Sequence, residues 1–304
     1  MRTDAADVEQ LATAPAFQSI GLGRKFKDNL ATVLFAAAFA IAVVPLLWVL
    51  WTLLERGLKP VLSADWWSHS FKGLLPTDFG GGIYHALVGT VFEGLVCLVF
   101  AVPLGVMVAV YLVEYGQQSK LAKAATFMVD ILSGLPSIVA GLFIYALWIT
   151  TFGMTRSGFA VALSLLLLML PVVVRVTETM LLIVPNELRE AAYALGLPKW
   201  KTIVRIVLPT ALSGIVTGVM LGLARVLGET APLLILVGYS SSINFDLFRG
   251  EMASLPLTIF MERSTGTIAG EYRMWGAALT LVIVIMLINL AATGLSKIFA
   301  IKTK

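Results

Sequence analysis

Long apolar runs separated by short polar segments dominate the pattern of this chain. Six of them are long enough to cross the roughly 30 Å hydrocarbon core of a bilayer as helices, which takes about 20 residues. They are predicted at Ala31–Leu54, Ala86–Val113, Thr126–Thr151, Phe159–Val184, Thr210–Gly238 and Met274–Phe299. The pattern predicts an all-α polytopic membrane protein with six transmembrane helices. It has a tail at 1–30 and one transmembrane domain at 31–304.

The composition supports lipid as the solvent over much of the surface. Charged residues make up 13% of the 304 residues, whereas a soluble domain carries about 25%. The single cysteine, Cys97, lies inside an apolar run and has no partner for a disulfide. Residues 1–23 mix acidic and apolar side chains and lack the apolar core of a secretory signal. The first apolar run is therefore expected to be a retained span.

The distribution of lysine and arginine predicts the orientation. With the N-terminus inside, the cytoplasmic segments hold 13 of the 22 basic residues, the outer loops hold seven and the spans hold two. Basic residues are enriched in short cytoplasmic loops. The chain is thus predicted to be a multi-pass protein of the plasma or inner membrane, with both termini in the cytoplasm.

A stripe of small residues follows one face of the fifth predicted span. Gly214, Gly218 and Gly222 repeat every four residues, a spacing that lets two helix backbones approach closely. The stripe is interpreted either as tight packing within the chain or as a seam against a second membrane-spanning chain.

The loop at 185–209 is basic and has a helical pattern. Asn186 is a good N-cap for a short helix, Gly196 ends that helix as only glycine readily can, and Pro198 opens a second helix. The apolar face of the first helix consists of Leu188, Ala191, Ala192 and Leu195. The pattern predicts a helix, a sharp bend and a helix, a shape suited to docking in a cleft of another protein.

The same loop resembles the coupling loop of bacterial ABC importer permeases. The match consists of Glu190-Ala191-Ala192, then Gly196, then Ile206 with Leu208-Pro209 at the family's spacing. The resemblance implies that Glu190, Ala191, Ala192, Gly196, Leu208 and Pro209 couple the spans to an ATPase subunit. The alternative is an amphipathic surface helix that matches by accident.

The chain is not expected to hydrolyse ATP itself. A Walker A loop needs a second glycine before its Lys-Thr pair, and Trp200 stands at that position before Lys201 and Thr202. ATP and Mg²⁺ are therefore expected on a separate ATPase subunit, with no cofactor, metal or catalytic residue on this chain.

Further stretches resemble phosphate importer permeases of the PstA type. They are Glu114–Gly116, Pro136–Val139, Gly141–Phe143, Arg175–Met180, Leu188–Gly196, Pro198–Trp200, Arg225, Gly228–Pro232, Leu255–Pro256 and Thr258–Phe260. The resemblance implies import of inorganic phosphate by alternating access. It also implies a second related permease, two ATPase subunits and an extracytoplasmic phosphate-binding protein as partners, besides membrane lipid. No nucleic-acid partner is expected.

Ionisable residues inside spans are the strongest candidates for the substrate path, because they are costly there and usually face a cavity or a partner. Arg175 and Glu178 are spaced i, i+3, and Arg225 and Glu229 are spaced i, i+4, so each pair can meet on one helical face. Arginine binds two phosphate oxygens at once. A neighbouring carboxylate can accept a hydrogen bond from protonated phosphate, which fully ionised sulfate cannot offer. Asp130, near the cytoplasmic start of the third predicted span, is interpreted as a helix-end or packing residue.

Several alternatives stay open for these residues. Arg175 could snorkel to the cytoplasmic face, Glu178 could be a surface residue, and Arg225 with Glu229 could be a purely structural pair. By helical rise Arg225 lies nearer the outside than Arg175. The two could then bind the anion in succession or form two sides of a gate. Alternatively, they share one pocket. Gly228 and Pro232 flank Glu229 and could break the helix there.

Two other functions are considered. One is the same machinery for another solute, such as molybdate, sulfate or an amino acid. The other is a membrane-embedded enzyme, which is disfavoured because His69 and His85 are the only histidines and there is no H-E-x-x-H motif.

Overall fold

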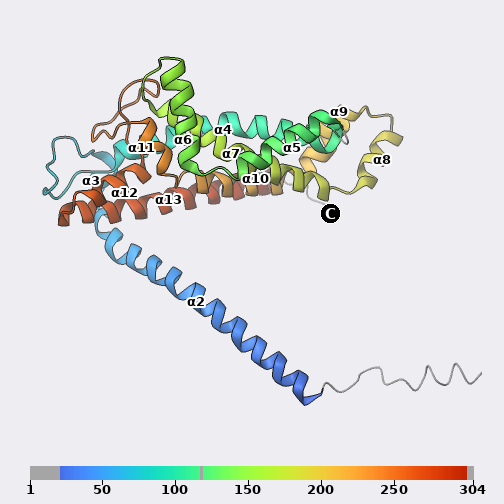
Figure 1. The fold of residues 1–304 in the computed structure, drawn as a ribbon, viewed down its shortest axis with the longest axis horizontal. Coiled ribbons are helices and arrows are strands. Elements are labelled where there is room, and N and C mark those ends of the chain that lie inside the picture. The colour runs from blue at the N-terminus through green and yellow to red at the C-terminus, as the bar shows by residue number, and fades with distance from the viewer. Residues whose placement is uncertain (1–20, 117–118, 300–304) are drawn as a thin grey trace, which may run out of the picture. The chain divides into compact units, whose positions relative to one another are not determined.

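The structure is a computed structural model that describes residues 21–116 and 119–299 (Figure 1). The chain divides into two units, 1–52 and 53–304. Helix α2, Leu22–Val61, contains the whole first predicted span and extends it at both ends. The tail residues 1–20 lie outside the described part of the chain.

The described residues contain helices and no strands. Five helical segments are long and apolar enough to cross a membrane, and a sixth span is reached if one bent pair of helices counts as a single span. The elements after α2 are α3 Ala64–Ser68, α4 Tyr84–Val110, η1 Tyr111–Gly116, α5 Lys120–Ser133, α6 Ser137–Ile144, η2 Tyr145–Thr151, α7 Gly158–Ile183, α8 Asn186–Ala194, α9 Lys199–Thr202, η3 Ile203–Val207, α10 Leu208–Val226, α11 Ala231–Leu236, α12 Leu255–Ser264 and α13 Ile268–Phe299.

Helix α7 forms the centre of the unit 53–304. It packs along α4 and α10, and α10 in turn packs on α13. Its fully buried side chains, among them Leu165, Met169 and Val173, belong to the main apolar core. Helices α8 and α9 lie at one end of this unit, and α3 and α12 lie toward the other (Figure 1).

The third predicted span, Thr126–Thr151, is not one straight helix. Helix α5 begins earlier, at Lys120, where the Ser119 hydroxyl caps the first turn by accepting a hydrogen bond from the Ala122 N–H at 3.1 Å. It ends at Ser133, and the following segment, α6 with η2, is bent by 109° relative to it. Pro136 explains the break, because proline lacks an N–H and disfavours helical backbone in the residue before it.

The fifth predicted span, Thr210–Gly238, is displaced along the chain. A continuous helical segment runs from Lys199 to Val226 through α9, the π-helical turn η3 and α10. Pro209 does not interrupt it, because the π-helical turn η3 ends at Val207, two positions before the proline, and places Pro209 in the first turn of α10, where proline is tolerated. The helix ends before Glu229, and α11 starts anew at Ala231. The break expected near Gly228 and Pro232 is thus confirmed.

The glycine stripe packs within the chain. A Cβ atom at Gly218 would overlap the side chain of Val176, and one at Gly222 would lie 3.0 Å from Val172 Cγ1. Gly214 faces Met180 in the same way. The structure therefore bears out close packing of α10 on α7, rather than leaving the stripe free for a second permease chain.

The segments between the first two predicted spans and between the last two contain short helices. The first contains α3, whose buried Trp66 donates its indole N–H to the Thr280 hydroxyl at 2.9 Å. The second contains α12, and α13 begins at Ile268, before the predicted start of the last span at Met274.

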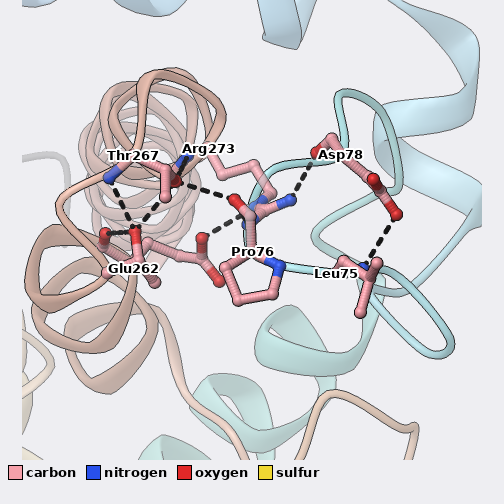
Figure 2. Close-up of polar contacts among 8 residues, drawn as sticks. Leu75, Pro76, Asp78, Glu262, Thr267 and Arg273 are labelled. Carbon is pink, nitrogen blue, oxygen red and sulfur yellow. Dashed lines mark hydrogen bonds and ion pairs between the residues drawn. The ribbon is translucent and has the colours of Figure 1, made fainter.

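A buried arginine ties these loops together (Figure 2). Arg273 on α13 donates from Nε to Glu262 Oε2 at 2.7 Å and from Nη1 to the Asp78 carbonyl at 2.7 Å. Its Nη2 donates to the Pro76 carbonyl at 3.2 Å. The carbonyl of Pro76 also accepts a hydrogen bond from the Thr267 hydroxyl, and Asp78 in turn holds the turn at Leu75 (Figure 2).

Candidate functional site

Arg225 and Glu229 line one cavity of about 220 Å³ between two helix breaks. One wall is the break between α5 and α6, with Ser133, Pro136 and Ser137, and the opposite wall is α7 at Leu168–Val172. Liquid water occupies about 30 Å³ per molecule, so the cavity has room for several small polar species. Both sequence-predicted residues of the fifth span therefore face the same space.

The two residues do not form the helical pair that the i, i+4 spacing predicted. Helix α10 ends at Val226, and the Glu229 N–H donates to the Val226 carbonyl at 3.1 Å in a tight turn. Glu229 thus leaves the helical path, and no ion pair within 4.0 Å joins it to Arg225 in the described part of the chain. Arg225 is exposed and has no side-chain partner among the described residues, whereas Glu229 is half-buried.

Arg175, by contrast, is held between two carboxylates. Its Nη1 donates to Glu178 Oε2 at 2.8 Å, which confirms the predicted i, i+3 pair. Its Nη2 donates to Asp130 Oδ1 on α5. Asp130, expected to be a helix-end or packing residue, is instead the second partner of Arg175. Asp130 and Glu178 also line a cavity of about 380 Å³ together with Lys123.

Arg175 does not line the cavity of Arg225, and its partners Asp130 and Glu178 line a second cavity instead. The Arg225 cavity faces α7 up to Val172, and the second cavity faces it at Glu178. Six residues of helix separate these points, which corresponds to about 9 Å along the axis. The alternative in which Arg175 and Arg225 share one pocket is not realised in this structure.

The loop at 185–209 has the predicted shape of helix, bend and helix. The N-cap position of its first helix, α8, is Pro185, so Asn186 is the first helical residue and not the predicted N-cap. The Asn186 Oδ1 accepts a hydrogen bond from Arg189 Nη1 at 3.2 Å. Gly196 has φ +77°, the left-handed conformation expected of a glycine after a helix end. Pro198 directly precedes α9 and acts as its N-cap, one position before the predicted one.

The predicted apolar face of α8 is largely uncovered. Leu195 is 82% exposed and Leu188 40% exposed, whereas Ala192 is buried against the chain. Ala191 and Glu190 are also exposed, and Leu208 and Pro209 at the start of α10 are half-buried. Large apolar side chains exposed together on a surface mark interaction sites.

The chain matches the family described as "Binding-protein-dependent transport system inner membrane component" over residues 101–304. Curated relatives of similar length include phosphate transport system permease protein PstA 1 of Mycobacterium tuberculosis H37Rv, 56% identical over 285 residues. That alignment covers 94% of this chain and 92% of the relative. The PstA protein of Yersinia pestis is 37% identical over 292 residues, covering 96% and 95% of the two chains.

Solved structures support the fold. A chain of the MetNI methionine ABC transporter in an inward-facing conformation matches with a TM-score of 0.56 at 21% identity, covering 71% of this chain and 94% of that one. A chain of a bacterial alginate ABC transporter, solved with its periplasmic protein, matches with a TM-score of 0.65 at 15% identity, covering 92% and 98%. The chain is a multi-pass inner-membrane transport subunit and not itself an enzyme, and it belongs to the binding-protein-dependent transport system inner membrane components as a permease of the PstA type.

Proposed function

We propose that this chain forms part of the path by which inorganic phosphate crosses the membrane through alternating access. Separate ATPase subunits bind ATP and Mg²⁺ and drive the movement through the loop at 185–209 of this chain. A second related permease completes the path, and an extracytoplasmic phosphate-binding protein delivers the substrate. The names of the relatives support phosphate as the substrate, and the cavity at Arg225 supplies the chemistry.

The observation that carries the proposal is an arginine without a partner in a cavity between two broken helices. Arg225 offers a planar fork of N–H donors that fits two phosphate oxygens. Helix α6 starts at Ser137 on the same cavity, and the first N–H groups of a helix carry partial positive charge and lack helical partners. Discontinuous helices that aim such ends at an anion are typical of transport sites.

Glu229 on the same cavity is proposed to select for protonated phosphate. Phosphate near neutral pH still carries a proton that can be donated to a carboxylate, and sulfate carries none. A free carboxylate next to the anion therefore penalises sulfate more than phosphate. This proposal keeps molybdate and sulfate as competitors to be tested on the same site.

Arg175 is proposed to act as an inner barrier and not as a resting site for the anion. Each of its two terminal nitrogens already donates to a carboxylate, that of Glu178 or that of Asp130. Phosphate reaching this level must displace at least one of them, which requires α5 and α7 to move apart. Arg225 and Arg175 would then be used in succession, with the helical rearrangement between them.

The coupling role of the loop is supported by its exposed surface. Glu190, Ala191 and Leu195 are turned to solvent on a helix that ends at Gly196. An uncovered helix face of this kind can dock into a groove of a partner protein. With the positive-inside orientation, this loop and both termini lie in the cytoplasm.

Replacing Arg225 with glutamine tests the path. The change removes the charge and the fork, and a lost charge-assisted contact of about 1.5–3 kcal/mol lowers phosphate uptake by about tenfold or more. Arg249→Gln is the matched control, because Arg249 is also exposed and its side chain has no partner among the described residues. Uptake of radiolabelled phosphate is measured in membranes that contain equal amounts of the complex.

The double variant Arg225→Gln with Glu229→Gln separates a path from a structural pair. If Arg225 only neutralises Glu229, removing both charges restores uptake. If Arg225 binds the anion, uptake stays low in the double variant. Full uptake in either variant would contradict the assignment of Arg225 to the path.

A further inference from the structure

Arg189 on α8 turns away from the exposed face of the loop and is saturated by its own chain. Its Nε and Nη2 donate to Glu114 Oε1 at 3.1 and 2.9 Å. Its Nη1 and Nη2 donate to the carbonyls of Val184 and Leu181 at 2.7 and 2.9 Å. With the bond to Asn186, the guanidinium makes five hydrogen bonds, and it has five N–H donors.

The Arg189–Glu114 pair is buried although it lies at a surface loop. Only 13% of the arginine side chain and 6% of the glutamate side chain are exposed. Burying two charges costs free energy, so a buried ion pair often stabilises a protein no more than packed apolar residues of similar volume. What the pair provides is a fixed geometry, because the arginine fork allows few arrangements.

The contacts of Arg189 join α8 to the end of α7, which directly precedes it in sequence, and to η1, since Glu114 lies 75 positions earlier. Glu114 lies in η1, which continues α4, and Leu181 and Val184 lie at the end of α7. The second helix of the loop is attached at the same place. Lys199 on α9 donates to the backbone carbonyl of Glu114, and its ammonium lies 4.9 Å from the centre of the Tyr115 ring.

Helix α7 leads from this junction to both charged cavities. It carries Arg175 and Glu178, and it contributes the wall at Leu168–Val172 to the Arg225 cavity. It also packs closely along α4, the other element that Arg189 joins. As long as the contacts of Arg189 hold, a displacement of α8 also displaces the end of α7. The walls that α7 contributes to both cavities then move with it.

We propose that Arg189 is a positioning residue which, with Glu114, fastens α8 to the ends of α4 and α7 so that movements of the loop reach the substrate path. The inference rests on the proposed function, in which an ATPase subunit moves this loop. Arg189 itself does not contact the ATPase or the substrate. Its effect is on the amount of phosphate imported for each ATP hydrolysed.

The test replaces the ionic clamp by a covalent one. Glu114→Cys with Arg189→Cys is introduced into a complex that otherwise lacks cysteines, including position 97. The full complex of both permeases, both ATPase subunits and the binding protein is reconstituted in liposomes. ATP hydrolysis and uptake of radiolabelled phosphate are measured before and after reaction with a short bismaleimide.

The unlinked variant is expected to hydrolyse ATP while phosphate imported per ATP falls by at least about fivefold, the lower end of typical coupling between sites. Cross-linking is expected to restore most of that ratio. Arg249→Gln is the matched control, since Arg249 lies outside the loop at 185–209, is exposed and its side chain has no partner among the described residues. An unchanged ratio in the unlinked variant, or no recovery after linking, overturns the proposal.

If the double-cysteine chain does not assemble, Arg189→Lys carries the test. Lysine keeps the charge but has three donors on one atom, so it cannot hold Glu114 and both carbonyls together, and the ratio falls by at least about twofold. A ratio equal to that of the unmodified chain overturns the proposal.

Gly196→Pro, assayed in parallel, tests the coupling role of the loop separately from the role of Arg189. If it uncouples hydrolysis from uptake and the changes at Arg189 do not, only the clamp is wrong. If neither change affects the ratio, the loop itself is not the coupling element.

Discussion

Replacing Arg273 with methionine is expected to destabilise the chain strongly, because it leaves Glu262 buried without a partner. The side chains of Arg273 and Glu262 are 3% and 8% exposed. The same change also removes the donors to the carbonyls of Pro76 and Asp78. Those bonds hold the segment between α3 and α4 against α13.

The magnitude follows from which groups lose their partners. Breaking a buried ion pair by removing one member costs about 3–5 kcal/mol. The carbonyl of Pro76 keeps its bond to Thr267, so Asp78 contributes the other unsatisfied group. In Arg273→Met with Glu262→Met no charge is stranded, and the remaining cost is about 1–3 kcal/mol for the unpaired carbonyl.

Cys97 provides the assay. It is the single cysteine of the chain, and its side chain is fully buried, so a thiol-reactive dye reports unfolding in detergent. A loss of 3–5 kcal/mol corresponds to a fall in the thermal midpoint of roughly 6–20 °C, at about 2–4 °C per kcal/mol for domains of 150–250 residues.

Arg263→Met serves as the control, because Arg263 is exposed and has no partner among the described residues. It is expected to leave the midpoint nearly unchanged. The reasoning fails if the double variant at Arg273 and Glu262 is no more stable than Arg273→Met alone, since the stranded carboxylate would then not be the cause.

Three further predictions concern packing, coupling and orientation. Gly218→Leu is expected to cost about 1–3 kcal/mol by overpacking α10 against α7, measured by the same dye assay with Leu221→Ala on the exposed face as control. Gly196→Pro is expected to leave insertion intact but to separate ATP hydrolysis from uptake, because proline cannot adopt a positive φ; normal import per ATP would contradict it. In a chain whose own cysteine is replaced, a cysteine at Phe245 should react with an impermeant reagent added outside intact cells and one at Lys123 should not. The reverse pattern would invert the orientation.

Short-range features of the chain could be predicted from sequence. Gly196 takes the positive φ that a glycine after a helix end suggests, and Arg175 meets Glu178 because both sit on one regular helix. The apolar runs likewise indicated where spans lie. These features depend on local geometry, which a single helix determines without the rest of the fold.

Long-range partners could not be predicted. Asp130 and Arg175 are 45 positions apart, and Glu114 and Arg189 are 75 apart, so only the packing of separate helices brings them together. The bounds of the fifth span were predicted wrongly for a different reason. Apolar residues continue past Val226 after the helix has ended, and hydrophobicity alone does not reveal a change of direction.

Four arginines differ in how many of their N–H donors are bonded within the chain: Arg175, Arg189, Arg225 and Arg273. Arg189 uses all five of its N–H donors within the chain, and Arg273 donates to one carboxylate and two carbonyl groups. Arg175 is neutralised by two carboxylates. Arg225 alone among these four has no partner in the described part of the chain, and it faces a cavity that also holds the start of α6. Because a charge inside a span is costly unless something pairs with it, we propose Arg225 as the arginine whose partner comes from outside the chain, and a phosphate ion as the partner that its fork fits.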